Sequence, residues 1–395
     1  MKKKVLILVA GIVISHWLCP ALATTYYVNP GQSIQTAIDS ASYLDTVQVA
    51  AGTYAENITL KNGVALVGAG AASTIIDPNG GTVVTAIGCD PNTRLTGFTI
   101  TGAAGSTYGG GMNNVYSHVI TTNCAFIANW ATYGGAMRNL RSDPNLLNCI
   151  FIGNSADMGG AIHNIQSSRP TITNCTFTRN SADIGGVMRN HNSAPKISNC
   201  ILWQNTAPTG PEISNSGSTV IISHSNIAGC GSSAAWDASF GTDGGGNLDR
   251  DPLFVSNPND GGDGWGDDPC TPADESANDN YGDLHLLAGS PCIDAGDNSA
   301  VIANPTDHEG NERIANVVVD MGAYERICPC SVIGDFDCSC GVDGVDFATF
   351  ALAWLTGPAD PAYKQACDIS NPGDDYIDVE DAKVLAENWL QLQEP

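Results

Sequence analysis

The sequence predicts an all-β solenoid, a parallel β-helix in which each short coil of chain stacks on the preceding one. Residues 119–215 contain four related copies, whose cysteines lie 25, 26 and 25 residues apart at Cys124, Cys149, Cys175 and Cys200. A fixed period in this range is typical of solenoids, whose repeats bury their apolar faces only by stacking. Within each copy, short alternating runs are broken by Asn, Gly and Ser, which indicates strands and turns rather than helices.

The length of the repeat predicts the content of one coil. About 25 residues accommodate three short strands and three turns, and equivalent side chains should then stack about 4.8 Å apart. We expect about eight or nine coils between residues 44 and 230, with the four repeat cysteines as buried free thiols. The other predicted ladders are Phe126, Phe151 and Phe177; Asn129, Asn154, Asn180 and Asn205; and Asn139, Asn164, Asn190 and Asn215.

The two ends of the solenoid are expected to be covered. Ser33 can cap a short amphipathic helix over residues 34–41, and such a terminal helix would protect the first coil. Residues 26–68 closely resemble the start of right-handed β-helix proteins of the pectin-lyase-like superfamily. That resemblance implies a single-stranded right-handed β-helix over residues 24–327. Within it, residues 251–255 and 284–325 resemble the closing segment of bacterial secreted β-helix proteins, which should cover the C-terminal edge.

The N-terminus and the charge indicate the compartment. Residues 1–23 have the charged start, apolar run and small-residue cleavage site of a signal peptide, so we expect a secreted or surface protein cleaved near Ala23, without a membrane-spanning segment. The formal net charge of −25 argues against a nucleic-acid partner. Many of the acids lie in the loop 256–283. Export favours disulfides, so we predict a Cys270–Cys292 bridge and structural disulfides among the tail cysteines.

The tail, residues 328–395, contains two loop–helix copies. In the first copy, oxygen-bearing side chains fall at positions 1, 3, 5, 9 and 12 of a twelve-residue loop, a spacing that suits calcium. The pattern resembles a type I dockerin, which implies two calcium ions and a cohesin partner for residues 334–392. Cys340 replaces the usual loop glycine, and the second loop is longer by two residues. The predicted calcium ligands are Asp335, Asp337, Ser339, Asp343, Asp346, Asp368, Ser370, Asp374, Asp378 and Asp381.

One set of polar residues repeats on the predicted solenoid and could carry chemistry. Arg138, His163 and Arg189 occupy equivalent places in successive coils, continued by Asn113 and Ser214, while Asp157 and Asp183 form a second column. Together the two columns could hold an anionic sugar chain, and Arg or His could act as a general base. Alternatively, the basic and acidic columns only neutralise one another at the surface.

Three functions remain open. The first is a secreted β-helix scaffold that binds, or is displayed on, extracellular or cell-surface polysaccharide and is attached through a calcium-binding dockerin-like tail. The second is a polysaccharide lyase or hydrolase acting on an acidic glycan such as pectate. The third is a purely structural surface or adhesion protein. The sequence lacks the paired-Asp and Gly-His-Gly motifs of polygalacturonases, and a shared fold does not by itself imply an activity.

Overall fold

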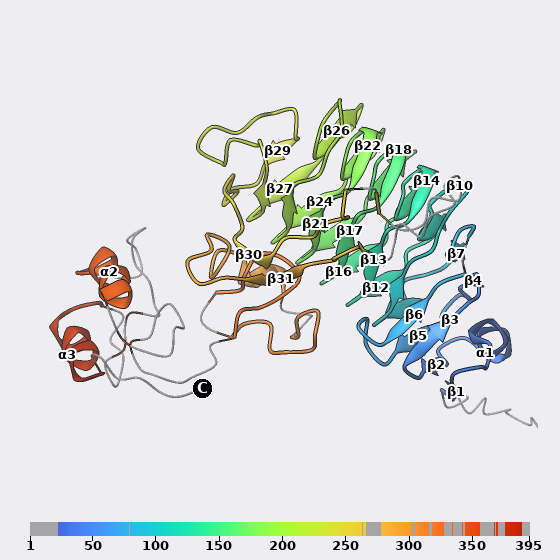
Figure 1. The fold of residues 1–395 in the computed structure, drawn as a ribbon, viewed down its shortest axis with the longest axis horizontal. Helices are drawn as coiled ribbons and strands as arrows, with labels where there is room; N and C mark the ends of the chain where they lie inside the picture. The colour runs from blue at the N-terminus through green and yellow to red at the C-terminus, as the bar shows by residue number, and fades with distance from the viewer. Residues whose placement is uncertain are drawn as a thin grey trace, which may run out of the picture.

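Most of the chain forms one parallel β-solenoid, which Figure 1 shows as a stack of coils running from the blue N-terminal end to the yellow-green strand β29. The computed structural model describes residues 23–78, 80–262, 264–265, 278–301, 305–315, 318–327, 334, 342, 344–355, 367, 369 and 376–388. The solenoid strands form four parallel sheets of ten, eight, seven and four strands, here called A, B, C and D. Ten stacked strands in sheet A correspond to about nine coils, as predicted.

The first three repeated coils contain four strands each, in the order A, B, D and C, and the fourth has only isolated bridges at the sheet D position. The prediction of three strands per coil is wrong, because the stretch between sheets B and C is itself extended. In β18, Ala156 points into the core while Asp157 is exposed, and this alternation is typical of a strand. Sheet D consists of β10 (Ser106–Tyr108), β14 (Trp130–Tyr133), β18 (Ser155–Met158) and β22 (Ser181–Ile184).

The other three sheets extend over more of the solenoid. Sheet A consists of β1 (Thr25–Val28), β2 (Thr46–Val49), β5 (Ala65–Gly68), β8 (Arg94–Thr96), β12 (Ile120–Thr122), β16 (Asn145–Leu147), β20 (Thr171–Thr173), β24 (Lys196–Ser198), β27 (Ile221–Ser223) and β29 (Thr242–Asp243). Sheet B consists of β3 (Gly52–Tyr54), β6 (Thr74–Ile76), β9 (Thr99–Ile100), β13 (Ala125–Ile127), β17 (Ile150–Ile152), β21 (Thr176–Thr178), β25 (Ile201–Trp203) and β28 (Asn226–Ile227). Sheet C consists of β4 (Ile58–Thr59), β7 (Val84–Ile87), β11 (Met112–Val115), β15 (Met137–Leu140), β19 (Ile162–Ile165), β23 (Met188–His191) and β26 (Ile213–Ser216).

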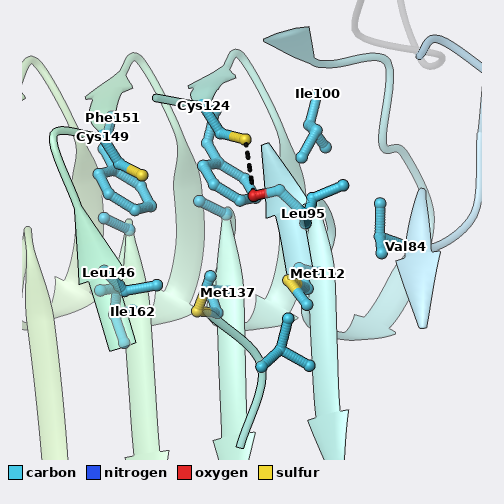
Figure 2. Packing of buried hydrophobic residues seen from close by; sticks show 14 of the residues in the cluster. Val84, Leu95, Ile100, Met112, Cys124, Met137, Leu146, Cys149, Phe151 and Ile162 are labelled. Carbon is cyan, nitrogen blue, oxygen red and sulfur yellow. Dashed lines mark hydrogen bonds between the residues drawn. The ribbon is translucent and has the colours of Figure 1, made fainter. Parts of the chain in front are cut away.

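The interior is built from the predicted ladders. The ring of Phe151 stacks between those of Phe126 and Phe177, with centroid distances of 4.9 and 4.5 Å. Cys124 and Cys149 lie one coil apart among buried apolar side chains in Figure 2, where a dashed line joins the Cys124 thiol to the carbonyl of Leu95. All four repeat cysteines are buried free thiols, which confirms that prediction. Their burial raises the pKa of the thiols of Cys124 and Cys175.

Asparagine ladders hold the bends together. The amide of Asn129 donates to the Oδ1 atom of Asn154 at 3.0 Å, and the same bond continues to Asn180 and Asn205 at 2.9 Å. Asn205 in turn donates to the buried carboxyl of Glu212 at 2.8 Å, so a side chain from the residue just before β26 ends this ladder. The second predicted ladder, from Asn139 to Asn215, is also present.

Both ends of the solenoid core are covered. Helix α1 (Ile34–Ser40) lies at the blue end in Figure 1, capped by the Ser33 hydroxyl, so the predicted cap is confirmed. At the other end, the loop around Trp236 and Phe240 packs on the core, and the amide of Asn215 donates to the carbonyl of Phe240.

The closing segment, here residues 251–265 and 278–327, follows a different course from the one predicted. It folds back along the outer face of sheet B instead of only covering the last coil, because that face carries apolar side chains, among them Ile150 and Ile201. Asn123 donates to the carbonyl of Asp307, and Asn199 exchanges hydrogen bonds with the backbone of Asp297. Its regular elements are β30 (Phe254–Ser256), β31 (Asp283–Leu286) and η2 (Asn298–Ala300), with the first two near sheet B in Figure 1.

The predicted bridge between Cys270 and Cys292 is wrong. Cys292 is a fully buried free thiol, whose sulfur accepts a hydrogen bond from the amide of Asn226 at 3.2 Å. Cys270 lies outside the described residues. Cys292 therefore serves as a packing residue between the closing segment and the solenoid.

The described part of the tail contains two helices, α2 (Gly344–Ala353) and α3 (Val379–Asn388), placed near those that the sequence predicts. Phe350 and Leu385 belong to a small apolar core of their own. Within the described residues, no helix is long and apolar enough to cross a membrane.

Candidate functional site

The basic column predicted from the repeats exists on sheet C. Strands β11, β15, β19, β23 and β26 pair in register, so that Arg138 aligns with His163 and His163 with Arg189. Asn113 and Ser214 extend the column by one coil at either end, as expected. The neighbouring residues in these strands, such as Met137 and Asn139, point inward, so the basic side chains lie on the outer face of the sheet.

Two tyrosines of sheet D pack against this column, and sequence reasoning missed them. Tyr108 and Tyr133 pair in register, with ring centroids 5.7 Å apart. The guanidinium of Arg138 lies 4.1 Å from the centroid of Tyr108, within the range of a cation–π contact. The ring of Tyr133 stacks on that of His163 at 5.5 Å. Each tyrosine therefore contacts the basic residue of the next coil. A signal was available, because Thr-Tyr-Gly-Gly occurs at residues 107–110 and again at 132–135.

Paired glycines explain why sheets D and C come so close. Gly134 has a φ of +71°, a conformation that favours glycine. A Cβ atom on Gly135 would lie 2.4 Å from the carbonyl oxygen of Gly160 and equally near that of Ser155. The turn is therefore too tight for any side chain, and this tightness places the tyrosines against the basic column.

The basic column is largely removed from water. Arg138 is 9% exposed and His163 is 4% exposed. Burial lowers the pKa of the Arg138 guanidinium, although arginine remains charged at neutral pH. Burial, together with the charges of Arg138 and Arg189, lowers the pKa of His163 to about 4. The column therefore presents two guanidinium groups with a neutral imidazole between them.

The side chains of the basic column have few hydrogen-bond partners among the described residues. The Nη1 atom of Arg138 lies 3.3 Å from the Oδ1 atom of Asn113, and Nη1 of Arg189 lies 3.2 Å from the Oγ atom of Ser214. The Nδ1 atom of His163 is buried without a hydrogen-bond partner among the described residues. Two buried or half-buried cations thus have neutral partners from the chain itself, and an anionic group would suit them.

The two aspartates do not complete the column. Asp157 and Asp183 lie on β18 and β22, where both are exposed. Among the ion pairs of the described residues, none joins either aspartate to Arg138 or Arg189. The described residues therefore show no direct ion pair between the two columns, and their mutual neutralisation at the surface stays a prediction.

The predicted calcium site can be placed only in part. Asp346 and Asp381 are fully buried at the first turns of α2 and α3, at equivalent positions of the two copies. The backbone N–H of Asp378 donates to the Oδ2 atom of Asp381 at 2.9 Å. In the described part of the chain, no group of three or more His, Cys, Asp or Glu residues could hold a metal ion. The predicted ligands outside the described residues are Asp335, Asp337, Ser339, Asp343, Asp368, Ser370 and Asp374.

The resemblance of the chain to known proteins of solved structure is distant. No curated protein matches the chain in sequence. A pectin methylesterase from carrot is 15% identical, over 56% of this chain and 81% of that chain, with a TM-score of 0.37. The pectate lyase Pel9A is also 15% identical, over 77% of this chain and 96% of that chain, with a TM-score of 0.34. The pectin methylesterase PemA from Erwinia chrysanthemi is 10% identical, over 67% and 86% of the two chains, with a TM-score of 0.26. Residues 85–248 match the family model described as the right handed beta helix region, so these coils form the right-handed parallel β-helix that the sequence predicts.

Proposed function

We propose that the β-helix binds a chain of acidic polysaccharide along the outer face of sheet C, with Arg138, His163 and Arg189 as the central contacts. The observation that carries this proposal is the pair of shielded guanidinium groups, whose hydrogen-bond partners among the described residues are neutral. That of Arg138 also lies over Tyr108, which stacks on Tyr133. Guanidinium groups bind carboxylates in a directed way, and aromatic rings offer flat apolar faces for sugar rings.

The dimensions of the column suit a polymer better than a small molecule. From Asn113 to Ser214 the column crosses five strands of sheet C, which amounts to four steps of about 4.8 Å, or about 19 Å in all. A rigid array of this length can contact several successive sugars without first ordering a loop.

The scaffold would act outside the cell and be held there by its tail. The signal-like residues 1–23 support export, and the duplicated acidic loops support calcium binding in residues 334–392. The burial of Asp346 and Asp381 at matching helix starts is what two calcium loops would require of their last ligands. A cohesin domain is the partner that the dockerin resemblance implies.

A lyase acting on the same glycan is the second candidate. Burial lowers the pKa of Arg138, which is the direction that a general base requires. In such a reaction the base would remove the proton beside the uronate carboxyl group, and the bond to the leaving sugar would break to give an unsaturated end.

One experiment separates these functions. The mature protein is titrated with polygalacturonate, alginate and chondroitin, with and without calcium, while the absorbance of unsaturated ends is followed. We expect binding of at least one of them without a rise in absorbance, and binding weaker by at least ~10-fold for Arg138→Ala and Arg189→Ala. Arg94→Ala removes the same charge from the exposed face of sheet A and should leave the affinity unchanged.

The other outcomes decide among the alternatives. A calcium-dependent rise in absorbance that Arg138→Ala abolishes would establish the lyase instead. Absence of binding to all three polymers would favour the purely structural role. For the tail, calorimetric titration of the mature chain with calcium should show about two sites. Asp346→Ala should remove one of them, and a flat titration at millimolar calcium would contradict the dockerin-like assignment.

A further inference from the structure

His163 differs from the other members of the basic column. Arg138 and Arg189 each contact a polar side chain of a neighbouring coil, whereas His163 makes no side-chain hydrogen bond within the described chain. Its ring is covered by Tyr133 on β14 and lies in register between the two arginines on β15 and β23. A buried polar atom without a partner is uncommon in proteins, and such atoms are concentrated at functional sites.

The surroundings of His163 oppose its protonation. The charged and titratable groups that act on it are Arg138 from β15, Arg189 and His191 from β23, and all three favour the neutral imidazole. The aromatic neighbour Tyr133 supplies apolar surface, and burial acts in the same direction. The free protein therefore holds a neutral imidazole between two positive charges, and it can accept a proton only if that repulsion is relieved.

We propose that His163 takes up a proton when a carboxylate of the glycan binds between Arg138 and Arg189, so that the affinity for acidic glycans rises as the pH falls. This inference rests on the proposed function, because it concerns the same site. The bound anion offsets the repulsion from the arginines and can accept a hydrogen bond from the imidazolium. The proton comes from the solvent, and no covalent bond changes.

The sign of the effect follows from linkage. An anion that raises the pKa of His163 must, by the same free energy, bind more tightly to the protonated form. At a pH between the pKa of His163 in the free protein and its pKa in the complex, the affinity for the anion rises by up to tenfold for each unit by which the pH falls. The binding of a neutral glycan is not coupled to the protonation of His163, so His163 makes the site selective for the charge of the glycan as well as for its shape.

The test is calorimetric titration of the mature protein with oligogalacturonate at about pH 7 and about pH 5, in buffers of different ionisation enthalpy, which measures the protons taken up on binding. For the wild type we expect net proton uptake and an affinity higher by ~10-fold at the lower pH. Fully methyl-esterified oligogalacturonate, which lacks the charge, should bind without proton uptake.

Two variants test whether His163 is the residue that takes up the proton on binding. His163→Gln should lose both the proton uptake and the pH dependence of the affinity, whatever its affinity at pH 7. His191→Gln is the matched control, since His191 lies exposed on the same strand as Arg189, and it should keep both. Wild-type binding without proton uptake, or unchanged uptake in His163→Gln, would overturn this inference and leave the binding site standing. Oligogalacturonate that fails to bind at either pH would refute the proposed function and this inference together.

Discussion

The carboxyl group of Glu212 should make the stability of the solenoid depend on pH, and replacing it should stabilise the protein. Glu212 is 2% exposed and accepts a hydrogen bond from Asn205 at the end of a buried asparagine ladder. Burial raises its pKa from the ordinary value of 4.5 to about 8, against the opposing effect of the hydrogen bonds from Asn205. The folded protein therefore keeps this carboxyl protonated at neutral pH, whereas the unfolded chain releases the proton.

The magnitude follows from that difference. Because the folded state binds the proton more tightly, the free energy of unfolding falls as the pH rises from about 4.5 to about 8. Each unit is worth about 1.4 kcal/mol, so the loss amounts to about 3 kcal/mol at pH 7 and about 5 kcal/mol at pH 8 and above. Glu212→Gln keeps an oxygen that can accept the bond from Asn205 and carries no titratable group.

The measurement is urea unfolding of wild type and Glu212→Gln at about pH 5 and about pH 8, followed by far-UV circular dichroism. We expect similar stabilities at the lower pH and a variant more stable by several kcal/mol at the higher one. Glu312→Gln, at an exposed glutamate, controls for the change in net charge. Parallel pH responses of Glu212→Gln and the wild type, or a variant that is less stable at pH 8, would refute this account of the buried carboxyl.

Four further predictions concern the interior and its turns. Cys175→Ser should cost no more than ~1 kcal/mol of unfolding free energy, because Ser225 holds the equivalent place two coils later and makes the same kind of backbone contacts. Cys175→Val should cost ~1–3 kcal/mol, because it leaves the backbone N–H of Cys149 without its acceptor. Gly135→Ala should lower the free energy of unfolding by at least ~2 kcal/mol, since its Cβ would lie 2.4 Å from two carbonyl oxygens. The midpoint of thermal unfolding should fall accordingly. Phe151→Ala should cost ~3–5 kcal/mol in urea unfolding, because it empties the middle of a three-ring stack; a cost under ~1 kcal/mol would mean that the stack contributes little.

The parts of the fold that repeat were predictable from the sequence. A period of 25 or 26 residues fixes the register between coils, so the alignment of Arg138 with His163 and the burial of Cys149 followed from spacing alone. The fourth sheet was not predicted, because its strands are short and only Ala131 and its equivalents mark an inward-facing position. The tyrosine pair was missed for the same reason.

The parts that depend on distant contacts could not be predicted. Asn123 bonds to Asp307 across 184 residues, and Asn199 bonds to Asp297 across 98, so no local pattern indicates where the closing segment lies. The electrostatics of the site were equally inaccessible. The sequence shows a histidine between two arginines in the repeat, but only packing reveals that His163 is buried and that its Nδ1 atom lacks a partner.

The backward course of the closing segment constrains how such a protein can evolve. Repeat proteins commonly gain or lose whole units by duplication or deletion. Here the non-repeating closing segment is hydrogen-bonded to particular coils through Asn123, Asn148 and Asn199. A coil inserted between Asn123 and Asn199 would move these two residues apart by about 4.8 Å. Adding or removing a coil between the anchors would therefore break or displace hydrogen bonds to the closing segment, and length variation should be favoured in coils outside it.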